Sequence, residues 1–109
     1  MTQKPLILRA QAEQDIEQAL KYYLDEGAEQ AALAFVNALE STFKQIVRQP
    51  AIGSPRYALE LELPGLRFWR VSRFPYLVFY RELDDHLDVW RVLHVQRDIP
   101  ARMSTNEPD

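Results

Sequence analysis

Residues 66–95 read LRFWRVSRFPYLVFYRELDDHLDVWRVLHV. Aromatic and β-branched residues, which pack well in sheets, dominate three segments of this stretch, residues 66–71, 76–83 and 87–95. The segments are separated by SRFP and DDH, which are short enough to be tight turns. The stretch therefore predicts three consecutive strands joined as an antiparallel meander.

The preceding half of the chain carries two helical patterns. Apolar residues recur at helical spacing over residues 12–23, and Gly27 follows where a C-terminal cap is expected. A second pattern covers residues 31–46 and ends before Pro50, which cannot continue a helix. Because the connection at Gly27 is very short, we expect the two helices to form an antiparallel hairpin that covers the sheet.

The remaining segments complete the expected architecture. The run Leu6–Leu8 is short and apolar, which favours a first strand. Residues 49–65 contain three prolines and two glycines, so we expect an irregular connection, with an extended piece at Leu59–Leu63, where leucine and glutamate alternate. The element order predicts an α+β domain: an N-terminal strand and a helical hairpin packed on an antiparallel sheet that the C-terminal meander completes. We expect one domain over residues 1–103 and a loose tail over 104–109.

Composition excludes several classes of protein. Of the 109 residues, 47% are hydrophobic and 27% are charged, which is typical of a folded domain. Cysteine is absent, so disulfide scaffolds, thiolate catalysis and thiolate metal sites are excluded. We find no signal-peptide core and no stretch that approaches a membrane span, and expect a cytoplasmic protein without membrane contact. His86 and His94 are not at metal-ligand spacing, and we expect neither a metal nor another cofactor.

Positive charge is concentrated in the second half of the chain. The net charge of −3 does not favour non-specific binding of nucleic acid, and we expect no direct sequence-specific binding either. Between Leu63 and Arg81, however, the charged residues are Arg67, Arg70 and Arg73, and Asp and Glu are absent. Strand alternation places Arg67 and Arg70 on opposite faces. The arginines are therefore either solvated or ion-paired side chains, or contacts to an acidic partner.

Two stretches near the C-terminus, RFPYLVFYR at 73–81 and VLHVQRDIP at 92–100, carry a recognisable motif. FVNAL at 35–39, followed by Phe43, and PAIG at 50–53 accompany them upstream. Together they resemble the ParE family of the RelE/ParE toxin superfamily over roughly residues 6–103. The resemblance implies the fold expected above, and a toxin of a type II toxin–antitoxin pair that a ParD-like antitoxin neutralises.

The resemblance also implies alternative targets. ParE members block DNA gyrase, whereas RelE members cut mRNA in the ribosome with basic side chains and a tyrosine. By resemblance Arg67 and Arg97 stand at basic positions of the RelE site, but other basic or tyrosine positions hold Trp69, Tyr76 and Met103. We therefore predict a toxin that inhibits gyrase by binding. The alternatives are a ribosome-dependent mRNA endonuclease and a degenerate member that only binds its antitoxin.

Candidate site residues fall into three groups. For a nuclease, the candidate catalytic residues, with tyrosine and histidine as acid and base, are Arg67, Tyr80, His94 and Arg97. The residues expected to contact the target are Arg67, Arg70, Arg73, Tyr76 and Arg97. The aromatic and aliphatic residues expected to contact the antitoxin are Phe35, Leu39, Trp69, Phe74 and Trp90.

Packing offers a simpler explanation for the strand residues among these candidates. Ideal alternation places His94 on the same side of its strand as Trp90 and Val92, which favours a partly buried imidazole that packs and hydrogen bonds.

Overall fold

The computed structural model describes residues 3–96 and 99–104. Four strands form one sheet in the order β1-β4-β3-β2. The strands are β1 (Leu6–Leu8), β2 (Leu66–Arg70), β3 (Tyr76–Glu82) and β4 (Leu87–His94). The helices are α1 (Ala10–Asp25), α2 (Glu29–Arg48), α3 (Arg56–Glu60) and α4 (Ile99–Ser104), with a 3-10 turn, η1 (Pro50–Ile52).

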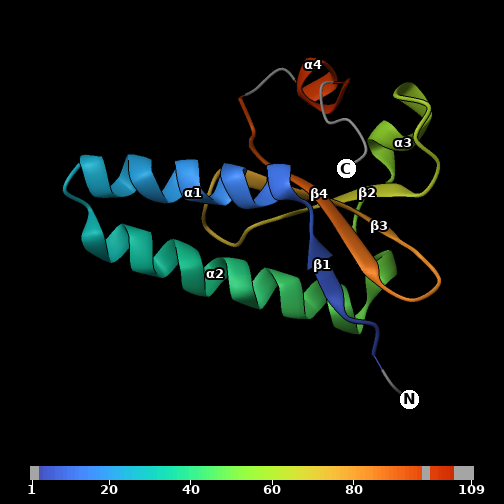
Figure 1. The fold of residues 1–109 in the computed structure, drawn as a ribbon, viewed down its shortest axis with the longest axis horizontal. Coiled ribbons are helices and arrows are strands. Elements are labelled where there is room, and N and C mark those ends of the chain that lie inside the picture. The colour runs from blue at the N-terminus through green and yellow to red at the C-terminus, as the bar shows by residue number, and fades with distance from the viewer. Residues whose placement is uncertain (1–2, 97–98, 105–109) are drawn as a thin grey trace.

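The two long helices lie side by side as an antiparallel hairpin (Figure 1). Gly27 adopts a φ of 70° between them, a left-handed conformation that suits glycine at the end of a helix. Strands β2, β3 and β4 pair antiparallel in sequence order, which confirms the predicted meander. The predicted α+β class, with an N-terminal strand and a helical hairpin, is also confirmed.

Each face of the sheet contributes to its own core. The first core joins the hairpin to the sheet and includes Ala12, Ala19, Phe35, Leu39, Ile46, Val78, Tyr80, Val89 and Val92. The second core lies on the opposite face, where α3 and α4 pack, and contains Leu66, Phe79, Trp90, Leu93, Ile99 and Met103. Both faces are therefore covered, which removes most of the apolar surface of the sheet from water.

The sheet is mixed, because β1 runs parallel to β4 and places Leu6 opposite Leu87. The expectation of a wholly antiparallel sheet is corrected at this strand. A parallel neighbour requires a long crossover connection, and the chain between β1 and β4, which includes the whole hairpin, provides one.

A bulge changes the facing of side chains in β4. Phe79 opposes Arg91 and Tyr80 opposes Val89, so Trp90 has no opposite residue in β3. The extra residue shifts the alternation, and Trp90 lies in the second core whereas Val92 lies in the first. The prediction that Trp90 shares a side with Val92 is therefore wrong.

The extended piece predicted at Leu59–Leu63 is also wrong, because this segment overlaps α3 and the turn that follows it. The backbone N–H of Leu61 donates to the carbonyl of Tyr57, as in a helix. Leu59 is 89% exposed, so its alternation with glutamate does not mark a buried sheet face. The neighbour of β2 beyond the meander is instead Ser54, which forms an isolated bridge with Phe68.

The short helix α4 was not predicted from the sequence. Its residues Ile99 and Met103, one turn apart, are both buried in the second core. The predicted loose tail, 104–109, overlaps this helix at Ser104, and residues 105–109 lie outside the described part of the chain.

Candidate functional site

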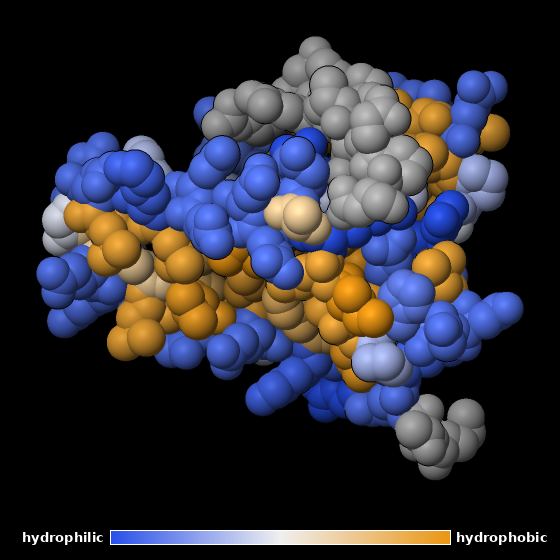
Figure 2. Space-filling model, in the orientation of Figure 1, coloured by the Kyte–Doolittle hydropathy of each residue, from blue (hydrophilic) through white to orange (hydrophobic). Residues whose placement is uncertain are grey.

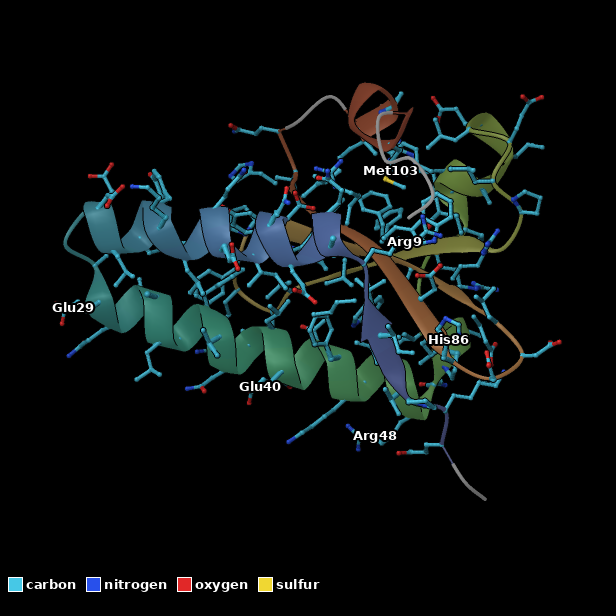
Figure 3. The ribbon with its side chains drawn as sticks, viewed as in Figure 1. Arg9, Glu29, Glu40, Arg48, His86 and Met103 are labelled. Atoms are coloured by element: carbon cyan, nitrogen blue, oxygen red, sulfur yellow. The ribbon has the colours of Figure 1, made fainter. Side chains whose placement is uncertain are left out.

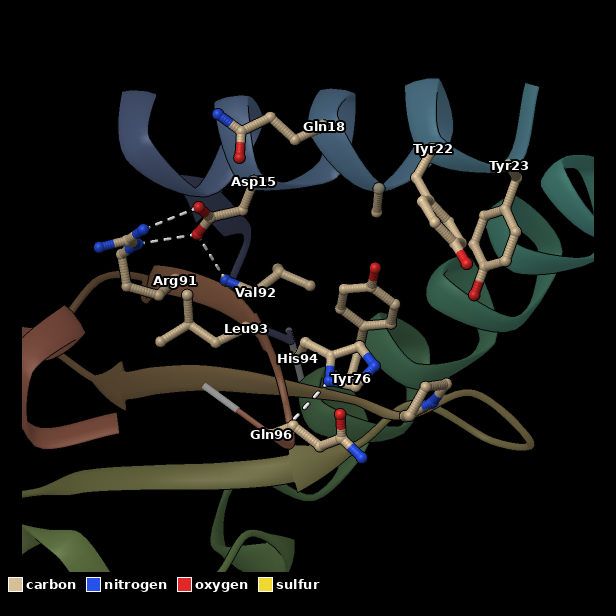
Figure 4. Close-up of a pocket in the computed structure, with 12 residues that line it drawn as sticks. Asp15, Gln18, Tyr22, Tyr23, Tyr76, Arg91, Val92, Leu93, His94 and Gln96 are labelled. Atoms are coloured by element: carbon tan, nitrogen blue, oxygen red, sulfur yellow. Dashed lines mark hydrogen bonds and ion pairs between the residues drawn. The ribbon is translucent and has the colours of Figure 1, made fainter. Parts of the chain in front are cut away.

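A groove of about 680 Å³ follows the open edge of β4 (Figure 4). Strand β1 pairs with residues 87–89 of β4. Within residues 3–96 and 99–104, no strand lies next to the rest of this edge, and α1 lies beside it. The lining residues come from α1, from β4 and the residues after it, and from the start of β3 and the residue before it: Asp15, Gln18, Ala19, Tyr22, Tyr23, Pro75, Tyr76, Arg91, Val92, Leu93, His94 and Gln96. The groove thus combines aromatic side chains with hydrogen-bonding groups.

A buried ion pair closes one end of the groove. The carboxylate of Asp15 accepts hydrogen bonds from Nε and Nη2 of Arg91, each at 2.8 Å. Oδ2 of Asp15 also accepts the backbone N–H of Val92 at 2.9 Å. The side chains of Asp15 and Arg91 are 8% and 7% exposed. The carboxylate therefore satisfies an edge amide of β4 that would otherwise need a strand partner.

Tyr76 and His94 meet in the same groove. Their ring centres are 5.2 Å apart and the rings are nearly perpendicular. Nδ1 of His94 accepts the backbone N–H of Gln96 at 3.1 Å, which assigns the proton of a neutral imidazole to Nε2. Tyr76 also joins an aromatic cluster with Phe35 and Phe74, so its ring is anchored to the core of the hairpin.

The predicted arginines do not form one patch. Arg67 faces the first core, where its Nη1 donates to the carbonyl of Gly53 at 2.7 Å. Arg70 is exposed at the end of β2, opposite Leu77 of β3. Arg73 is exposed in the β2–β3 turn and has a φ of 69°, an unfavourable conformation for a residue with a Cβ. Arg97 lies outside the described residues.

The comparison with protein families agrees with this architecture. Residues 6–99 match the family described as the ParE toxin of the type II toxin–antitoxin system, parDE. The chain belongs to the ParE toxin family.

One solved structure shares the ParE-like fold of this chain. It is described as the chromosomal ParDE TA system from P. aeruginosa, and it matches with a TM-score of 0.69 and 20% sequence identity. The match covers 84% of this chain and 96% of that chain. No match was found among curated proteins.

In this ParE-family chain, Tyr80 is a structural residue. Its side chain is fully buried, and its hydroxyl donates to the carbonyl of Pro50 at 2.6 Å and accepts the N–H of Gly53 at 2.9 Å. Burial raises the pKa of the phenol above its ordinary value. Tyr80 therefore fixes η1 to the sheet and is not placed to contact a substrate, contrary to its candidate role in catalysis.

The aromatic and aliphatic residues expected to contact an antitoxin are mostly internal. Phe35, Leu39 and Trp90 are at most 7% exposed and belong to the two cores. Trp69 is partly buried, and its Nε1 donates to Oε1 of Gln45 at 3.0 Å. Phe74 is also partly buried, with its ring against Tyr23 and Phe35. Because helices cover both faces of the sheet, an antitoxin would have to contact side chains outside the two cores.

Sequence reasoning missed the Asp15–Arg91 pair of the ParE-like domain. The sequence does contain one signal, because Asp15 stands between Ala12 and Ala19 on the stripe of α1 that becomes buried. A carboxylate on a buried stripe requires a partner. The identity of that partner depends on tertiary structure, since 76 positions separate Asp15 from Arg91.

The described residues of the ParE-family chain contain neither a metal-binding cluster nor a membrane-spanning helix. Among residues 3–96 and 99–104, no group of three His, Cys, Asp or Glu residues could hold a metal ion. His86 lies in the β3–β4 turn, where its Nδ1 is 2.7 Å from the carboxylate of Asp85. None of the described helices is long and apolar enough to cross a membrane.

Proposed function

We propose that this ParE-family chain is a toxin that inhibits DNA gyrase by binding it, without cleaving a covalent bond. The strongest support for binding rather than cleavage is that side chains which a nuclease would need for catalysis are engaged in hydrogen bonds within the fold. Tyr80 is buried with its hydroxyl in two hydrogen bonds, and the guanidinium of Arg67 donates to a backbone carbonyl. Met103, which stands at a further position of the RelE-type site, is a core residue.

The surface that we assign to the target consists of Arg70, Arg73 and Tyr76. Arg70 and Arg73 are exposed, and within the described part of the chain neither forms an ion pair. Tyr76 follows the turn that carries Arg73 and lines the groove. Exposed guanidinium groups without an ion-pair partner in the described part of the chain suit an acidic protein surface.

The surface that we assign to the antitoxin lies on the helical hairpin. Figure 2 shows a band of hydrophobic surface along the two helices and across β1. Large hydrophobic residues exposed on these elements include Ile7, Leu24 and Leu33, at 51%, 54% and 63%. An exposed apolar surface of this kind is typical of a site that binds another protein. These residues replace Phe35 and Leu39 as the proposed antitoxin contacts.

Supercoiling of relaxed plasmid by purified gyrase tests the proposed target. We expect the purified chain to reduce supercoiling in a concentration-dependent manner. Arg73→Glu is the variant that alters the proposed contact to gyrase. Because Arg73 is exposed and lies outside both cores, the substitution should leave the fold intact. Unchanged supercoiling at saturating toxin would refute gyrase as the target.

A second candidate function is cleavage of ribosome-bound mRNA, which the contact between Tyr76 and His94 in an open groove favours. Histidine and tyrosine can exchange a proton with a ribose hydroxyl or a leaving oxygen. Codon-specific cuts that are lost in His94→Gln and in Arg97→Ala would establish this activity. Normal growth of cells that express the chain alone would instead identify a degenerate member that only binds its antitoxin.

A further inference from the structure

A second polar cluster lies where β1 meets β4, away from the groove. Asp88 of β4 accepts hydrogen bonds from Nε and Nη2 of Arg9, at 3.1 and 2.9 Å. Oδ2 of Asp88 also accepts Nε1 of Trp90 at 2.9 Å. Both oxygens of the carboxylate are therefore engaged, and the charge of Asp88 is matched by that of Arg9.

The guanidinium of Arg81, the second one in this cluster, forms no ion pair with any of the described residues. Arg81 of β3 stands directly opposite Asp88 in the sheet, but the pair forms no ion pair. The guanidinium carbons of Arg9 and Arg81 lie 4.1 and 5.4 Å from the ring centre of Trp90. The neighbouring Glu82 pairs with Lys4 at 2.9 Å. Counted over these four residues alone, the cluster of Arg9, Arg81, Asp88 and Trp90 carries one excess positive charge.

Two buried hydrogen-bond donors in the cluster are unused. Nη1 of Arg9 and Nε of Arg81 are both buried, and neither has a hydrogen-bond partner in the described part of the chain. A buried N–H of a charged group that lacks a partner is costly, and folded proteins rarely leave such groups unpaired. Two of them beside one indole ring indicate that an acceptor is missing from this place.

We propose that Arg9 and Arg81 bind an oxyanion, a carboxylate or a phosphate group, beside Trp90. Guanidinium groups match the geometry of both ligands and form charge-assisted hydrogen bonds with them. Arg9 also precedes α1, so the positive end of a 16-residue helix adds to the potential. Figure 3 shows Arg9 at the start of α1, on the side where Met103 of α4 lies. Neither the proposed gyrase surface nor the proposed antitoxin surface uses this cluster.

Trp90 provides a direct readout of binding. The chain has two tryptophans, so Trp69→Phe leaves Trp90 as the one source of indole fluorescence. We expect inorganic phosphate or acetate, titrated at constant ionic strength, to change this fluorescence in a saturable manner. In the unmodified chain, the saturating anion is expected to raise the melting temperature by roughly 4 °C. Phosphate and acetate are titrated in separate experiments. A saturable response to either anion supports the proposed site and shows which type of oxyanion it binds.

The matched variants are Arg81→Gln and Arg70→Gln, both made in the Trp69→Phe background and in the unmodified chain. Arg81→Gln is expected to weaken anion binding by about tenfold or more, because it removes one of the two guanidinium groups. It is expected to melt no lower than the unmodified chain without added anion, because it removes an uncompensated charge. Arg70→Gln removes an exposed arginine of β2 and is expected to bind normally. A response that does not saturate, or equal binding by the two variants, would overturn the proposal.

Discussion

Asp15 of α1 and Arg91 of β4 form a buried ion pair in which Oδ2 of the aspartate lies 2.8 Å from Nε of the arginine. The pair lies beyond the point where β1 stops covering the edge of β4. Because the same carboxylate accepts the N–H of Val92, the helix supplies the acceptor that a further strand would have supplied. A short β1 and a longer β4 can therefore coexist in one sheet.

Asp15→Ala is expected to lower the free energy of unfolding by about 3–5 kcal/mol, because it removes a buried carboxylate that pairs with the guanidinium of Arg91 and accepts the N–H of Val92. Urea unfolding followed by circular dichroism measures this loss. The control is Asp25→Ala, which breaks an exposed pair with Lys21 and should leave the urea midpoint nearly unchanged. The double variant Asp15→Leu, Arg91→Leu is expected to recover the part of the loss that comes from the guanidinium, but not the part that comes from the N–H of Val92, which still lacks its acceptor. A loss in Asp15→Ala no larger than that in the control would contradict this account.

Local patterns were sufficient to predict most of the fold. The helical hairpin follows from the spacing of apolar residues and from Gly27, and the meander follows from three strand-like segments with short turns. Both depend on neighbours in sequence, which is why they could be predicted.

The features that were missed depend on contacts between distant segments. The bulge at Trp90 is a mismatch in the pairing of two strands. Helix α3 is stabilised where Tyr57 packs on Phe68, and alternation of leucine and glutamate gave the opposite prediction. The candidate site residues were predicted least well. Phe35, Tyr80 and Trp90 are buried because helices pack on both faces of the sheet, and this packing cannot be read from local patterns.

Gly53→Ala is expected to destabilise the chain by about 1–3 kcal/mol, as overpacking does. A Cβ at Gly53 would lie 2.5 Å from the hydroxyl of Tyr80 and 2.9 Å from the carbonyl oxygen of Phe68. Thermal unfolding of Gly53→Ala, Tyr80→Phe and the double variant measures the coupling. We expect Tyr80→Phe to cost less in the Gly53→Ala background, because the hydroxyl is then displaced already. Additive losses would show that the two groups do not compete for space.

The phenol of Tyr80 should titrate later than an exposed tyrosine, because burial raises its pKa above the ordinary value of 10.0. The folded state favours the neutral phenol, so this contribution to stability is complete below pH 10 and is lost as the pH rises through the folded pKa. Ultraviolet titration of the unmodified chain should show a late tyrosinate component that is smaller in Tyr80→Phe. Tyr23, whose pKa burial also raises, remains in both proteins and is the internal reference. Titration of Tyr80 together with the exposed tyrosines would contradict the prediction.

Arg73 allows a role in target binding to be separated from a role in folding. Its φ of 69° costs about 1–2 kcal/mol in a residue with a Cβ, so Arg73→Gly should melt at or above the temperature of the unmodified chain. Arg73→Glu keeps the strain and reverses the charge, so its melting temperature should change little while inhibition of supercoiling is lost. If Arg73 contacts gyrase, both variants inhibit less than the unmodified chain, and the glutamate variant is the weaker because it repels an acidic surface. Parallel losses of melting temperature and inhibition in both variants would assign Arg73 to the fold instead.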